Sequence, residues 1–263
     1  MFSPYHLVGL RPFPFFVSLV LGSVFFFGVF GMHYYSYGWF FVFFLLLIFV
    51  VLLWFGNVEY EASTGNHSLV VRKGLRLGML LFISSEVLFF FSFFWRYFHN
   101  CWSPSVSIGT WPPFECGNYV LDPFAIPLLN TVYLLSSGVR ITACHQIIVN
   151  KGKRLGLFIS WYVTVLYGLL FLDFQLEEYM FTRFSINSSV YGSVFFMLTG
   201  FHGFHVILGL VLLFFWFLRF KYVIEFSSDQ HVSFEITAWY WHFVDVVWLF
   251  LFIVVYWYTS IIP

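Results

Sequence analysis

The stretch from Phe234 to Ser260 constrains the fold most, because it is long and apolar yet carries ionisable side chains. As a helix it would rise about 40 Å, more than the ~30 Å hydrocarbon core of a bilayer. Its first half holds Glu235, His242 and Asp245, and the last two share a helix face at a spacing of three. Ionisable groups in membrane helices usually face protein or water. Alternatively, these groups lie at head-group level near the helix start and only anchor it.

Composition places the whole chain in a membrane. Of its 263 residues, 61% are hydrophobic and 9% are charged, against about 25% charged in a soluble domain. The apolar runs do not alternate with a period of two, which favours helices over a barrel. The net charge of zero gives no electrostatic case for nucleic acid. We therefore predict an all-α polytopic membrane protein.

Seven hydrophobic spans form a single membrane domain over residues 1–263. Their approximate bounds are Phe13–Met32, Trp39–Phe55, Gly74–Phe98, Pro127–Val149, Leu155–Phe174, Val190–Phe220 and Phe234–Ser260. The first two occupy about residues 13–55 and the other five about 74–260. The gap between the first two is short, which predicts an antiparallel hairpin. The gap after the second is longer and polar.

Basic residues indicate the orientation. Nine of the twelve Lys and Arg fall on the side of the N-terminus: Arg11, Arg72, Lys73, Arg76, Lys151, Lys153, Arg154, Arg219 and Lys221. By the positive-inside rule, the N-terminus faces the cytoplasm or matrix. Arg140 is an exception, and it either reaches the interface or pairs with an acid on a neighbouring helix.

Glu86 lies near the centre of the third span. A carboxylate at that depth must be protonated, paired or wetted, since a lone charge costs several kcal/mol. It is therefore a functional candidate. The alternative is a neutral carboxyl group hydrogen-bonded to Ser84 or Ser85.

Histidines in the sixth span could bind a haem or a metal. His202 and His205 are three residues apart near mid-membrane, and with His242 they could ligate a b-type haem or a metal. Alternatively, they are packing histidines bonded to neighbouring helices. The same span carries a small-residue face suited to close helix packing, formed by Thr199, Gly200, Gly203 and Gly209.

The three cysteines include no Cys-x-x-Cys pair, which excludes a thiolate zinc site of the usual spacing. Cys101 and Cys116 share the loop that follows the third span. They form either a disulfide or two free thiols.

Several motifs carry a family resemblance. They are GLRLGMLLFISSE from Gly74, PLLNT from Pro127, TGFHGFH from Thr199 and AWYWHFVDVVWLFLF from Ala238. Together they resemble subunit III of the haem–copper cytochrome c oxidases. The resemblance implies two helices splayed from a five-helix bundle, with phospholipid in a V-shaped cleft between them. It is loosest before Trp39 and in the loops.

The resemblance also implies a function. The complex would oxidise cytochrome c, reduce oxygen to water and pump protons. Haem a, haem a3 and copper would belong to partner subunits I and II, with accessory subunits around them. This chain would hold no cofactor or metal; it would support stability, bind phospholipid and contribute to oxygen or proton access. A b-type haem protein using His202, His205 and His242, or a stand-alone transporter, is the alternative.

Specific residues take roles by the same resemblance. Glu86 would face the catalytic subunit, whereas His202, His205, His242 and Asp245 would be structural polar groups. Residues expected to hold lipid head groups are Trp54, Glu61, His67, Arg219 and His231.

Composition indicates where the chain is encoded and located. Forty-one Phe against four Ala indicate a T-rich organelle genome, because Phe codons are rich in T and Ala codons in G and C. We therefore expect the mitochondrial inner membrane, with a bacterial plasma membrane as the alternative.

Overall fold

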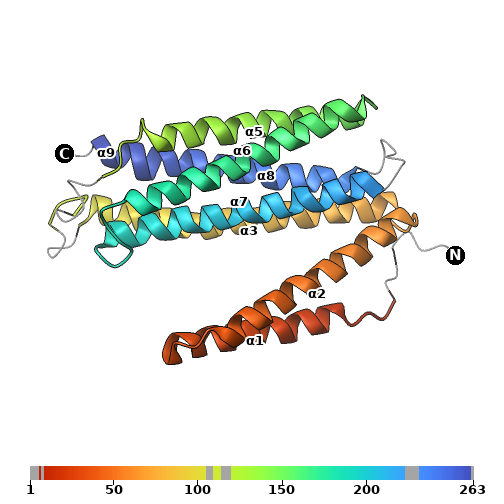
Figure 1. Ribbon diagram of the computed structural model, residues 1–263, viewed down its shortest axis with the longest axis horizontal. Helices are drawn as coiled ribbons and strands as arrows, with labels where there is room; N and C mark the ends of the chain where they lie inside the picture. The colour runs from red at the N-terminus through yellow and green to blue at the C-terminus, as the bar shows by residue number, and fades with distance from the viewer. Residues whose placement is uncertain (1–5, 7–8, 105–108, 114–119, 223–230, 262–263) are drawn as a thin grey trace. The chain divides into compact units, whose positions relative to one another are not determined.

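The computed structural model describes residues 6, 9–104, 109–113, 120–222 and 231–261, apart from the side chains of residues 63 and 219–222, and this part of the chain is helical without strands (Figure 1). The helices are α1 (Phe13–Tyr34), α2 (Gly38–Ser63), α3 (Leu69–Trp102), α5 (Ile126–Val149), α6 (Arg154–Phe181), α7 (Val190–Tyr222) and α8 (Val232–Leu251). A π-helical segment η1 (Phe252–Tyr258) and a short α9 (Thr259–Ile261) follow.

Within the described residues, seven helical segments are long and apolar enough to cross a membrane, which confirms the predicted number of spans. The last of them combines α8, η1 and α9 into a continuous segment of 30 residues, Val232–Ile261. The predicted bounds agree closely at α5 and less well around the connection between α2 and α3.

The second helix is longer than the sequence suggested. It runs to Ser63 rather than ending near Phe55, so Glu59 and Glu61 lie on a helix and not in a loop. Glutamate is a good helix former and does not by itself end a helix. The turn that follows contains Gly65 with a φ of 82°, a left-handed conformation that favours glycine.

The third helix begins earlier than predicted, at Leu69. The hydroxyl of Ser68 accepts a hydrogen bond from the backbone N–H of Val71 at 3.4 Å. Serine in this position caps the exposed N–H groups of a first turn. The capping serine therefore marks the start of α3 better than the end of the polar stretch does.

The chain separates into two compact units, Met1–Leu77 and Gly78–Pro263. In the first unit, α1 and α2 form the predicted antiparallel hairpin (Figure 1). The rings of Phe27 and Phe43 stack between them with centroids 5.0 Å apart and planes 8° apart. The V-shaped cleft expected from the family resemblance stays a prediction.

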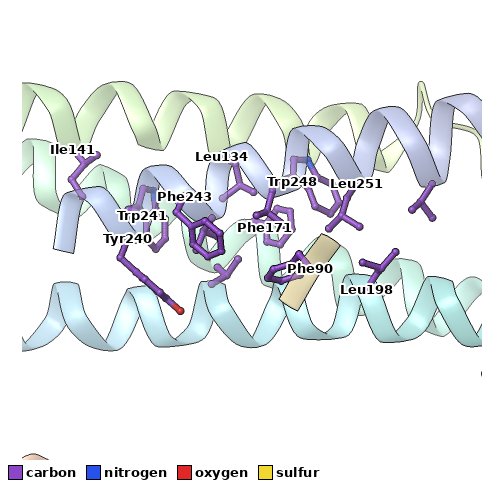
Figure 2. Close-up of a cluster of buried hydrophobic side chains, with 14 of the residues drawn as sticks. Phe90, Leu134, Ile141, Phe171, Leu198, Tyr240, Trp241, Phe243, Trp248 and Leu251 are labelled. Atoms are coloured by element: carbon purple, nitrogen blue, oxygen red, sulfur yellow. The ribbon is translucent and has the colours of Figure 1, made fainter. Parts of the chain in front are cut away.

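In the second unit, α8 supplies the centre of the core, and its indoles point among the neighbouring helices (Figure 2). Trp241 and Trp248 are fully buried. Their ring N–H groups donate to α5, from Trp241 to Ser137 at 2.8 Å and from Trp248 to Thr131 at 3.0 Å. Each tryptophan thus combines a large apolar contact with a satisfied polar group.

Two glycines let neighbouring helices approach the ring of Trp241. A Cβ atom at Gly168 of α6 or at Gly209 of α7 would lie 2.8 Å from this indole. By contrast, a Cβ atom at Gly200 or Gly203 would meet its nearest neighbour only at 4.0 Å. Of the three glycines in the predicted small-residue face, Gly209 alone is required by a close contact.

Candidate functional site

Glu86 pairs with a histidine of the sixth span. Its Oε2 atom lies 3.0 Å from Nε2 of His205, which links α3 to α7. The other ring nitrogen of His205 donates to the carbonyl of Phe201 at 2.7 Å. The edge of Phe90 packs on the same imidazole at a centroid distance of 5.1 Å. The sequence required this carboxyl group to be protonated, paired or wetted, and in the structure it is paired.

The two hydrogen bonds of His205 can be made without a net charge on the pair. The carbonyl of Phe201 can only accept, so Nδ1 carries a hydrogen. The contact between Nε2 and Glu86 then holds one further proton, on either the carboxyl group or the ring. Either arrangement is neutral overall. The pair therefore avoids the penalty of a lone carboxylate in a membrane.

The alternative prediction, a hydrogen bond from Glu86 to Ser84 or Ser85, is wrong. The hydroxyl of Ser84 donates to the carbonyl of Leu80 at 2.8 Å, and that of Ser85 donates to the carbonyl of Phe82 at 2.6 Å. Both hydroxyls thus return to their own helix, as serines in apolar helices commonly do.

His242 and Asp245 share a face of α8, as predicted, and this face meets α5. His242 Nδ1 lies 3.7 Å from Asp245 Oδ2, and its Nε2 lies 3.3 Å from the hydroxyl of Thr142. Asp245 is buried and its carboxylate occupies the space that a Cβ atom at Gly138 would need. A head-group anchor is therefore the wrong interpretation for Asp245, although Glu235 does lie in the first turn of α8.

His202 is a fully buried residue of α7. Its ring lies 5.4 Å from that of Phe171 and 5.2 Å from that of Trp248, measured between centroids. It does not join His205 and His242 in a cluster with metal-binding spacing among the described residues. His205 and His242 bond to α3 and α5 respectively, whereas both ring nitrogens of His202 are buried without a hydrogen-bond partner among the described residues.

The first unit holds a second polar cluster. The carboxylate of Glu61, which is buried, forms an ion pair with Arg11 and lies 3.3 Å from His6 Nε2. The ring of His6 lies 6.4 Å from that of His67. Sequence reasoning missed that Arg11 and His6 are the partners of Glu61, because they precede α1 and no local spacing connects them to α2.

Other predicted residues have mixed outcomes. Trp54 is exposed on α2, seven residues before Glu61 and therefore on the same face. His231 pairs with Glu235 at 2.9 Å. The side chain of Arg219 lies outside the described part of the chain. Arg140 is exposed and forms no ion pair with a described residue.

The disulfide between Cys101 and Cys116 stays a prediction. Cys116 lies outside the described residues, and Cys101 is a free thiol with respect to the others.

A buried polar pair near the end of α6 is not among the residues that the sequence analysis singled out. Glu178 is 2% exposed and Gln175 is 4% exposed. The amide of Gln175 donates to the hydroxyl of Tyr256 in η1 at 3.5 Å. The spacing of three between Gln175 and Glu178 could have revealed this inward-facing polar pair.

These features define a polytopic helical membrane protein in which one ionisable pair, Glu86 and His205, joins two membrane-spanning helices. The sequence of residues 3–260 matches the family model described as Cytochrome c oxidase subunit III. The chain belongs to the cytochrome c oxidase subunit III family.

Individual relatives named Cytochrome c oxidase subunit 3 align along nearly their whole length. The protein of Chondrus crispus is 43% identical over 258 residues, covering 97% of this chain and 93% of the relative. That of Triticum aestivum is 45% identical over 262 residues, covering 98% and 97%. That of Patiria pectinifera is 44% identical over 267 residues, covering 98% of each.

Proposed function

We propose that this chain is a core subunit, without a catalytic metal centre, of a proton-pumping cytochrome c oxidase in the mitochondrial inner membrane. Haem a, haem a3 and copper belong to partner subunits I and II in this proposal. Family membership supports it, as do similar proteins named as oxidase subunits. The bias of basic residues supports a matrix location for the N-terminus.

The pair of Glu86 and His205 is the observation that carries the proposed role. Glu86 is 22% exposed. Phe82 and Phe89, one turn to either side of it, are also exposed. Intramembrane ionisable groups rarely face lipid. This face of α3 therefore suits contact with another protein subunit, and we assign the catalytic subunit to it.

Stabilisation of that subunit is the primary role in this proposal. An ionisable pair at the contact also suits a part in proton uptake, because it holds a transferable proton. The aromatic surface beside it suits passage of an apolar molecule such as oxygen. These two roles depend on the same contact.

Phospholipid binding is the second part of the proposal. Arg11, His6 and His67 gather near the end of α2, and Trp54 lies two turns before Glu61. Cationic side chains beside an interfacial tryptophan suit an anionic head group. Arg219 would hold a further head group at the end of α7.

Purification through a tag on this chain, in a mild detergent, tests the proposal. We expect haem a absorption bands and two larger oxidase subunits to co-purify, together with phospholipid. The chain itself should remain haem-free once it is stripped from the complex. Recovery of the chain alone with a b-type haem spectrum would contradict the proposal; cross-linking in intact membranes controls for dissociation by detergent.

A further inference from the structure

One group of side chains in the second unit has metal-binding spacing and lies apart from the pair of Glu86 and His205. It consists of His145, His231 and Glu235. His145 lies in the last turns of α5, whereas His231 and Glu235 flank the start of α8, four residues apart. α5 and α8 pack against each other, so the end of one helix meets the beginning of the other.

The donor atoms of this group converge. Glu235 Oε1 lies 2.9 Å from His231 Nε2 and 4.0 Å from His145 Nε2. The candidate ligand atoms of the three residues all lie within 4.8 Å of one another. In a tetrahedral zinc site with bonds of about 2.0–2.1 Å, ligand atoms are about 3.3 Å apart. Small side-chain rotations would therefore bring all three to bonding distance.

The surroundings hold the group in place. The ring of His145 stacks on buried Phe234, with planes 11° apart and centroids separated by 6.1 Å. Its Nε2 atom is buried and forms no hydrogen bond with any described residue. In the tautomer protonated at Nδ1, this nitrogen is available as a ligand, and it lies 4.0 Å from Glu235 Oε1. His231 and Glu235 are each 14% exposed.

We propose that His145, His231 and Glu235 form a binding site for a divalent transition-metal ion, with Zn²⁺ as its best match. Two imidazole nitrogens and one carboxylate oxygen suit zinc and disfavour Mg²⁺ and Ca²⁺, which take oxygen ligands. Three protein ligands leave a fourth position for water. Bound zinc cross-links the end of α5 to the start of α8.

Zinc itself is the probe for the test. The purified oxidase complex is stripped with a chelator, titrated with Zn²⁺ and analysed for metal content by mass spectrometry. We compare the wild type with His145→Gln and Glu235→Gln, which retain polar side chains of similar size. His99→Ala, on an exposed position of α3, is the matched control. Metals bound by other subunits contribute equally to every sample, so they cancel when the metal content of a variant is subtracted from that of the wild type.

We expect the wild type and His99→Ala to bind one zinc ion more than either ligand variant. Where binding is still measurable, the ligand variants should be at least about tenfold weaker, since even loss of an outer-shell partner weakens metal sites to this extent. Unchanged zinc content in both ligand variants would overturn the proposal. If neither variant assembles, the difference in zinc-edge X-ray absorption between stripped and zinc-loaded wild type decides: two imidazoles, a carboxylate and a water support the site, and any other shell rejects it.

Discussion

At the scale of single residues, the protein places two of its glutamates beside histidine or arginine partners. Glu86 bonds to His205, and Glu61 pairs with Arg11 and His6. Burying an unpaired charge costs far more than burying a neutral hydrogen-bonded pair. Pairing therefore lowers the cost of placing ionisable side chains in this mostly apolar chain, of which only 9% is charged.

Two substitutions at Glu86 separate pairing from proton exchange. The amide of Glu86→Gln can donate to Nε2 of neutral His205, so we expect the complex to assemble normally. Glu86→Leu leaves that nitrogen unpartnered at a cost of about 1–3 kcal/mol, and we expect less of this chain to co-purify with the complex. Quantitative mass spectrometry of tagged complexes measures both effects.

The control for these variants is Glu177→Gln, since Glu177 is exposed on α6. The rate of turnover of the assembled Glu86→Gln complex then shows whether the titratable proton of Glu86 matters for proton uptake. Slower turnover or a shorter catalytic lifetime, with Glu177→Gln unchanged, would support a role in proton uptake. Equal assembly of Glu86→Leu and the wild type would refute the importance of the pair for the contact.

At the scale of helices, the core depends on the close approach of α6 and α7 to α8. The indole of Trp241 lies against Gly168 on one helix and Gly209 on another, and its N–H donates to α5. Membrane helices gain association energy from such packing and from interhelical hydrogen bonds, without a hydrophobic driving force between them. Trp241 thus connects α8 to three other helices.

Gly209→Ala tests this packing, with Gly200→Ala on the same helix as its matched control. The new methyl group at residue 209 would lie 2.8 Å from the indole, whereas that at residue 200 would lie 4.0 Å from the nearest atom. Overpacking of this kind costs about 1–3 kcal/mol. We expect Gly209→Ala to speed thermal inactivation of the complex at least about fivefold, and Gly200→Ala to leave it unchanged. Equal inactivation rates would contradict this account.

The sequence predicted helices better than it predicted the partners of their side chains. Hydrophobic length alone gave the seven spans, and a spacing of three placed His242 and Asp245 on one face. The partner of Glu86 is 119 residues away along the chain, and such contacts leave no local pattern. The same reason applies to Arg11 with Glu61, and to His145 with Glu235. The true end of α2 lies beyond the hydrophobic stretch, because Glu59 and Glu61 favour helix although they are not apolar.

At the scale of the whole molecule, seven spans separate two aqueous faces, and the basic residues favour one of them. All four lysines, Lys73, Lys151, Lys153 and Lys221, are on the predicted inner side. An odd number of spans then puts the two termini on opposite sides. Lys151 and Lys153 lie between α5 and α6 and are exposed, so they are suitable reporters of orientation.

Chemical labelling from each side tests this topology. A membrane-impermeant amine reagent should modify Lys151 and Lys153 in inverted inner-membrane vesicles and spare them in right-side-out vesicles, because the positive-inside rule places this turn in the matrix. Peptide mass spectrometry locates the modified lysines, and detergent-opened vesicles give the maximum extent of labelling. Preferential modification in right-side-out vesicles would reverse the assigned orientation. It would also move the ends of α5 and α8, and with them His145, His231 and Glu235, to the opposite compartment, so this one measurement also determines which pool of zinc the proposed site would meet.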